Sequence, residues 1–96
     1  MINEIPSNCI IKIGRNTKLL ESFLKFLEEN TIVKWLGRGN PTNFDKYYYS
    51  NVNYLIIQNN DLGYSCTEDF IKTTHPYNTY PLVKIPNNIL KPLYYD

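Results

Sequence analysis

The most regular pattern of hydrophobic and polar positions in this chain lies between Asn16 and Glu29. Asn16 or Thr17 can cap the first turn of a helix, because a short polar side chain there accepts a hydrogen bond from a free backbone N–H. Apolar residues recur at the three- and four-residue spacing of one helical face, at Leu20, Phe23, Leu24 and Leu27, with Leu19 and Phe26 widening the stripe. The pattern predicts a long amphipathic helix that packs its apolar face on a sheet.

Five shorter segments carry the apolar or alternating pattern that is typical of β-strands. They run from Cys9 to Ile13, Ile32 to Leu36, Tyr54 to Ile57, Leu62 to Cys66 and Tyr80 to Ile85. The third and fourth are joined by four polar residues, which predicts a β-hairpin. In the second, Val33 and Trp35 should point to one side, and Ile32, Lys34 and Leu36 to the other. Pro81 lacks a backbone N–H, so the last strand should lie at an edge of the sheet or begin there.

The order of these elements predicts the fold class. Thr67 can cap a short second helix that ends at about Lys72. Glu68 and Asp69 lie in its first turn, where negative charges interact favourably with the helix dipole. Strands mixed with two helices predict an α+β fold, a single two-layer domain with a mostly antiparallel or mixed β-sheet, one long helix across one face and a short second helix. We expect this domain to span residues 1–86. Residues 87–96 form a Pro-containing apolar tail, expected either to pack on the domain or to make a homo-oligomer contact.

Composition narrows the function classes. The 96 residues carry a net charge of +1, whereas a duplex-binding domain usually has a strongly basic balance. No apolar run is long enough to span a bilayer, and the first residues lack the pattern of a secretory signal, so we expect a cytosolic protein without a membrane partner. Nine tyrosines are the most informative feature, because tyrosine suits interfaces and stacking surfaces. AT-rich coding, which raises Lys, Asn, Ile and Tyr together, explains them equally well.

Catalytic and metal-binding patterns are sparse. The two cysteines, Cys9 and Cys66, have no metal-ligand spacing, and both are expected to be reduced and buried in strands. A thiol enzyme would need Cys66 activated by His75, the single histidine. The turn Gly37-Arg38-Gly39 lacks the third glycine and the following helix of a phosphate-binding loop. The sequence therefore predicts a non-enzymatic protein without metal or cofactor.

Binding chemistry is concentrated in the second strand and in the long connection after it. Connections of more than about 12 residues in a compact domain are often functional, and the segment from Asn40 to Asn53 exceeds that length. Aromatic rings can stack on a nucleobase or a protein side chain, and cationic and amide groups can contact phosphate. The candidate binding residues are Trp35, Tyr47, Tyr48, Tyr49, Tyr54, Tyr64, Lys34, Arg38, Asn40 and Lys46.

Each of these candidates also has a structural interpretation. Trp35 could lie in the core under the long helix, since a single tryptophan in a strand is usually largely buried. Tyr54 and Tyr64 could form a cross-strand pair, and the tyrosines at 47–49 could pack within the loop. Arg38 is expected to be exposed because of its position in the turn.

The order of a strand, a Leu/Phe-rich helix, a Trp-containing strand with a glycine–proline turn and a Tyr-rich hairpin resembles small bacteriophage proteins of the anti-defence type. The matching segments are Cys9–Ile13, Leu19–Leu27, Ile32–Pro41, Tyr54–Ser65 and Tyr80–Ile85. The resemblance implies a protein that antagonises a bacterial defence system. It would do so by stoichiometric binding of a host effector protein, which we slightly prefer, or by sequestering a nucleotide-derived immune signal.

Other functions remain open at the level of sequence. The main alternative is a single-stranded nucleic-acid-binding protein that combines Tyr/Trp stacking with a local basic patch. Two further alternatives rank lower: a small enzyme that uses Cys66, and a structural or assembly role.

Overall fold

The computed structural model describes residues 5–37, 39–85 and 89. Arg38 and nearly all of the predicted tail at 87–96 therefore lie outside the described residues. The elements are β1 (Asn8–Lys12), α1 (Thr17–Asn30), β2 (Lys34–Trp35), the 3₁₀ helices η2 (Pro41–Asn43) and η3 (Lys46–Asn51), β3 (Tyr54–Gln58), β4 (Asp61–Ser65), α2 (Glu68–Thr73), the 3₁₀ helix η4 (Tyr77–Thr79) and β5 (Leu82–Val83).

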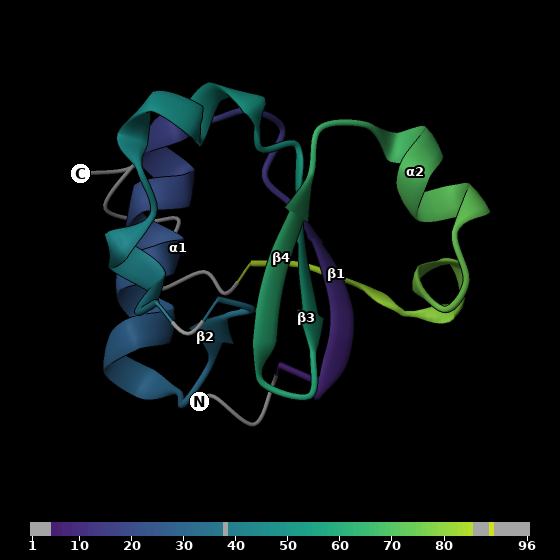
Figure 1. Cartoon of the computed structure of the whole chain (residues 1–96), viewed down its shortest axis with the longest axis horizontal. Helices are drawn as coiled ribbons and strands as arrows, with labels where there is room; N and C mark the ends of the chain where they lie inside the picture. Colours follow the sequence, from purple (N-terminus) through teal and green to yellow (C-terminus); the bar gives the residue numbers. More distant parts are fainter. Residues whose placement is uncertain (1–4, 38, 86–88, 90–96) are drawn as a thin grey trace.

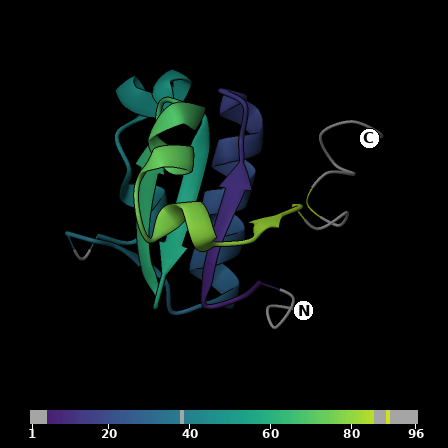
Figure 2. The ribbon, with the colours of Figure 1, turned by 90° about the vertical axis from the view of Figure 1, so that its right-hand side faces the viewer.

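One mixed sheet organises the chain. Its five strands lie in the order β2-β4-β3-β1-β5. The three central strands pair antiparallel, whereas β2 and β5 join the two edges in parallel. Figure 1 shows α1 on one side of this sheet and the shorter α2 on the other side, and Figure 2 shows the same arrangement from the side. The predicted α+β fold class is confirmed.

The long helix α1 forms because an N-terminal cap, an apolar stripe and a C-terminal cap define the same stretch of chain. The side chain of Asn16 accepts a hydrogen bond from the backbone N–H of Leu19 at 3.0 Å, as the sequence predicts for an N-cap. At the other end, both the backbone N–H and the Oγ1 of Thr31 donate to the carbonyl of Leu27. The stripe between these caps is fully buried at Leu20, Phe23, Leu24 and Leu27. It packs on the face of the sheet formed by Cys9, Ile11, Leu55, Ile57 and Leu62.

The opposite face of the sheet has a smaller core. Ile10 and Ile56 point away from α1, because successive residues of a strand alternate between faces. Tyr54 of β3 lies on the same face, and Ile71 of α2 packs with these residues. The sheet is therefore covered on both faces, by α1 and the connection that contains η3 on one side and in part by α2 with η4 on the other.

Two predicted strands are shorter than the sequence pattern suggests. The segment from Ile32 to Leu36 contributes only β2, and the segment from Tyr80 to Ile85 contributes only β5. Each is an edge strand whose chain leaves its one neighbour early. β2 pairs only with Asp61 and Leu62, although β4 continues to Ser65. β5 pairs only with Ile10 and Ile11, although β1 continues to Lys12. The predicted alternation in the first of them is confirmed, because Val33 is buried and Trp35 half-buried, while Ile32 and Leu36 are both 74% exposed.

The prediction that both cysteines are buried is half wrong. Cys9 has no exposed surface, and burial raises the pKa of its thiol to about 11. Cys66, in contrast, is exposed. It follows the last residue of β4, in the bend that leads to α2, and its carbonyl accepts a hydrogen bond from the Arg15 guanidinium at 2.9 Å. The strand pattern of the sequence extends to Cys66, but β4 ends at Ser65, where the chain leaves the sheet.

Within the described residues, none of the helices combines the length and the apolar character that crossing a membrane requires.

The hairpin turn between β3 and β4 gives a first prediction. Asn59 and Asn60 both have positive φ, 52° and 72°, which is typical of a two-residue type I′ turn that favours glycine. Asn60→Gly should raise the free energy of unfolding by about 0.5 kcal/mol, because glycine adopts φ > 0 without a steric cost. Asn60→Ala should lower it by about 1 kcal/mol. Urea denaturation measures both, and equal stabilities of the two variants would contradict this account of the turn.

Candidate functional site

The connection between β2 and β3 is an ordered structure made of two short helices. Pro41 occupies the first turn of η2, where its missing N–H costs nothing. Asp45 caps η3, because its side chain accepts a hydrogen bond from the backbone N–H of Tyr47 at 2.9 Å. Phe44 lies between the two helices, and its position organises the aromatic residues of this region.

Phe44 is the centre of an aromatic cluster. Its ring stacks on Trp35, with the ring centroids 4.5 Å apart, and on Tyr49 at 5.8 Å. The ring of Tyr64 meets it edge-on at 5.3 Å. The indole N–H of Trp35 donates to the carbonyl of Pro41 at 3.0 Å, which ties β2 to the start of η2. Three of the predicted binding residues therefore hold the connection on the sheet.

Sequence reasoning missed Phe44. The available signal was the single phenylalanine of the connection, flanked by the polar residues Asn43 and Asp45. An aromatic ring in such a segment usually has a packing partner, since burial of a ring releases a large apolar area from water.

Tyr47 and Tyr48 stand on the outer side of this cluster. Their side chains are 79% and 42% exposed, and their rings meet edge-on with centroids 5.0 Å apart. The ring of Tyr48 also contacts Phe44, with the centroids at 6.3 Å. The two tyrosines are thus presented to solvent by a turn of 3₁₀ helix that is capped at its start and packed from beneath. We call this pair the tyrosine surface.

The predicted cations do not converge on the tyrosine surface. Lys46 pairs with Glu21 of α1, with Nζ and the carboxylate oxygen 3.5 Å apart. Lys34 donates to the side-chain oxygen of Asn40. It also lies near enough to Glu28 to contribute to lowering the pKa of that carboxyl. Glu21 and Glu28 are seven residues apart, about 10 Å along a helix, so the two lysines lie beside different turns of α1.

The remaining candidates divide between the two faces of the sheet or lie outside the described residues. The register pairs Tyr54 with Ser65 and Tyr64 with Leu55, so the expected cross-strand pair of Tyr54 and Tyr64 is wrong. Tyr54 belongs to the small core under α2, and Tyr64 packs against the large core. Arg38 lies outside the described residues, so the expectation of its exposure stays a prediction.

Electrostatic shifts in this region follow from hydrogen bonds and burial. Glu28 accepts hydrogen bonds from the hydroxyl of Thr42 at 2.6 Å and from its backbone N–H at 3.0 Å. These bonds favour the charged form and lower the pKa of Glu28. Burial, and to a lesser extent the charge of Glu21, raises the pKa of the Tyr49 hydroxyl. In the part of the chain that the structure describes, no group of three acidic, His or Cys side chains could hold a metal ion.

Comparisons with protein-family models, with curated proteins and with solved structures found no match. The resemblance to small bacteriophage proteins therefore depends on the order of the elements alone.

The aromatic cluster gives a second prediction. Phe44→Ala should lower the free energy of unfolding by about 2–3 kcal/mol, because it removes a ring that packs on several others. It should also shift the fluorescence of Trp35, the single tryptophan, to longer wavelength as its indole gains water. Tyr47→Ala is the control, since its exposed ring should change neither quantity appreciably. An unchanged emission spectrum in Phe44→Ala would contradict the central place of Phe44.

The contact between Glu28 and Thr42 gives a third prediction. The folded-state pKa of Glu28 is lowered from its ordinary value of 4.5, so the contact stabilises the protein above that value. This stabilisation is lost as the pH falls through the lowered folded-state pKa. A double-mutant cycle of Glu28→Ala and Thr42→Val should show coupling at neutral pH that declines toward zero in acid. Coupling that stays constant across this range would refute the assignment.

Proposed function

We propose that this chain is a non-enzymatic binding protein that engages a partner protein stoichiometrically through the tyrosine surface. The observation that carries the proposal is the exposure of Tyr47 and Tyr48 on a base that is already ordered. Tyrosine is enriched in the energetically important centres of protein interfaces, because its ring buries a large area and loses little side-chain entropy. A pre-ordered segment also avoids the entropy cost of ordering a loop on binding.

The placement of the cations supports a protein partner over a nucleotide-derived signal. Capture of a nucleotide needs positive charges or backbone N–H groups that converge on phosphate. Among the described residues, Lys34 and Lys46 lie beside different turns of α1, and each contacts a side chain of this chain. A protein surface, in contrast, requires only apolar area with a polar rim.

The positions of Lys34 and Lys46 also disfavour the alternative of single-stranded nucleic-acid binding. Such proteins combine stacking rings with a continuous positive groove along the backbone. Tyr47 and Tyr48 could stack on bases, but the nearby charges are of both signs: Asp45 caps η3, and Lys46 is paired with Glu21. This arrangement favours a protein partner.

The biological setting follows from the resemblance stated above. We propose that the partner is a host defence protein and that binding in the host cytosol blocks its action. A homo-oligomer through residues 87–96 is part of this proposal; of that segment only Ile89 is described, and it is buried in the main core.

The fourth prediction tests the tyrosine surface in cells and in vitro. Wild-type protein should restore phage plating on a strain that carries the susceptible defence system, and should form a complex of fixed stoichiometry with one component of that system. Tyr47→Ala should weaken this complex at least about 30-fold, which is about 2 kcal/mol for an interface centre. Leu36→Ala is the matched control, because Leu36 is 74% exposed and lies beside Phe70 and Tyr77, on the α2 side of the sheet.

Three outcomes would oppose the proposal. If Leu36→Ala weakened the complex as much as Tyr47→Ala, the loss of binding would reflect general destabilisation of the protein and not a role of the tyrosine surface. Co-purification of a nucleotide in place of a protein would favour signal sequestration. A gel shift with single-stranded DNA at low salt, lost steeply as salt rises, would favour the nucleic-acid alternative.

A further inference from the structure

A hollow of about 290 Å³ lies beside the tyrosine surface, between the start of α1 and the first turn of η3. We call it the polar hollow, and it is lined by Thr17, Lys18 and Glu21 of α1 and by Lys46 and Tyr49 of η3. Lys46 directly precedes Tyr47, so the polar hollow and the tyrosine surface share one turn of η3. Pockets for whole small molecules occupy about 300–1,000 Å³, so this smaller volume suits a single polar group of a larger partner.

The hydroxyl of Tyr49 opens into the polar hollow. The residue is only 6% exposed, and its ring stacks on Phe44. Burial raises the pKa of the hydroxyl, Glu21 raises it further and Lys46 lowers it, so the oxygen lies close to both of these lining residues. No group among the described residues forms a hydrogen bond with this oxygen, and it is not sealed from solvent. A nine-tenths buried side chain therefore presents an unused donor to the polar hollow.

The charges around the polar hollow favour an anion. Of the described residues that line it, Lys18 and Lys46 are cationic and Glu21 is anionic, which leaves a net charge of +1. The start of a helix adds a partial positive charge, because its first N–H groups have no acceptor within the helix. The first turn of α1 contains no acidic residue that would offset it.

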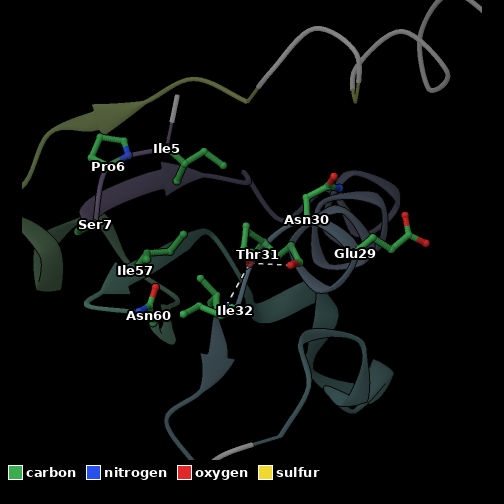
Figure 3. A pocket seen from close by; sticks show the side chains of 11 residues that line it. Ile5, Pro6, Ser7, Glu29, Asn30, Thr31, Ile32, Ile57 and Asn60 are labelled. Atoms are coloured by element: carbon green, nitrogen blue, oxygen red, sulfur yellow. Dashed lines mark hydrogen bonds between the residues drawn. The ribbon is translucent and has the colours of Figure 1, made fainter. Parts of the chain in front are cut away.

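The larger cavity at the opposite end of α1 lacks this arrangement (Figure 3). Its volume is about 480 Å³, and the residues that line it include Ile5, Ile32 and Ile57. The side chain of Glu29 is directed away from these residues. That cavity therefore offers apolar contact without a charge directed at a ligand, and it selects no one occupant.

We propose that the polar hollow binds a side-chain carboxylate, from an aspartate or a glutamate, of the protein partner that docks on the tyrosine surface. This inference rests on the proposed function and names the chemistry of one contact residue of the partner. The Tyr49 hydroxyl and the Lys18 ammonium group donate hydrogen bonds to the carboxylate, and such bonds to a charged acceptor are strong. A carboxylate carries one negative charge, which matches the net charge of +1, whereas a phosphate monoester carries nearly two.

The fifth prediction uses Nα-acetyl-aspartate N-methylamide, called the aspartate probe, with the folded protein at pH 7. In a ¹⁵N-HSQC titration at constant ionic strength, it should shift the amides of Thr17, Lys18 and Tyr49 saturably. The asparagine analogue has the same shape without the charge and should bind about fivefold more weakly. Equal affinities for the two analogues would overturn the site. Tighter binding of inorganic phosphate than of the aspartate probe would overturn the assignment to a carboxylate.

Two matched pairs of variants locate the carboxylate. Tyr49→Phe keeps the ring on Phe44 and should weaken binding of the aspartate probe about tenfold. Tyr64→Phe removes a hydroxyl from the same aromatic cluster outside the polar hollow, and should not. Lys18→Gln should weaken binding about two- to fivefold, whereas Lys25→Gln removes an exposed charge from the same helix outside the polar hollow and should leave it unchanged. Identical effects within either pair would overturn the site, and the HSQC spectrum itself reports that each variant is folded.

Glu21→Gln tests the sign of the electrostatic effect. The substitution removes the negative charge from the lining and releases Lys46 from its ion pair, so it should tighten binding of the aspartate probe about two- to fivefold. A purely structural role of the pair would leave binding unchanged or weaken it, and either result would overturn the proposal.

The complex of the fourth prediction separates this inference from the proposed function. In that complex, Tyr49→Phe should weaken binding and Glu21→Gln should tighten it. If Tyr47→Ala weakens the complex while the other two variants leave it unchanged, the proposed function stands and the carboxylate contact is overturned. If Tyr47→Ala leaves the complex intact, the tyrosine surface is refuted together with the partner's carboxylate, whereas the titration with the aspartate probe still reports whether the polar hollow binds an acid.

Discussion

The packing of α1 on the antiparallel strands β1 and β3 is the constraint on which the rest of the structure depends. Gly14 and Arg15 both adopt positive φ at the end of β1, and their N–H groups donate to the carbonyls of Asn53 and Val52 just before β3. This turn sets the direction in which α1 leaves the sheet, and burial of its leucines then fixes it across the face. Because α1 is fixed, Glu21 and Glu28 on its outer side can hold η3 and η2 through Lys46 and Thr42.

The elements that the sequence predicted well are those whose signals are local. The spacing of apolar residues and the Asn16 cap define α1, and the polar residues between two apolar runs define the hairpin. The edge strands were less predictable, because the sequence pattern does not mark the residue at which the chain leaves its neighbouring strand. Cys66 shows the same limit, since a pattern of residue types does not indicate where the chain bends away from its partner strand.

The position of the candidate site along the chain was predictable, but which of its aromatic rings are exposed and which are packed inside was not. Tyr47 and Tyr48 stand exposed on the connection that the sequence singled out, whereas Trp35, Tyr49 and Tyr64 became the packing around Phe44. Which ring is buried depends on where η2 and η3 place their Cα atoms, and no local pattern contains that information. The separation of Tyr54 from Tyr64 was more accessible, because a turn centred on Asn59 and Asn60 already implies that Tyr54 pairs with Ser65.

The charges of α1 run against the preference of a helix. Lys18 lies in the first turn and Glu28 and Glu29 in the last, although acidic residues stabilise the start of a helix and basic residues its end, by about 0.3–1 kcal/mol each. Glu28 is compensated by its two hydrogen bonds from Thr42, which connect the helix to η2. The side chain of Glu29, in contrast, points away from the residues that line the neighbouring apolar cavity (Figure 3). The unfavourable position of Glu28 at the end of α1 is therefore offset by the same contact through which the helix holds η2.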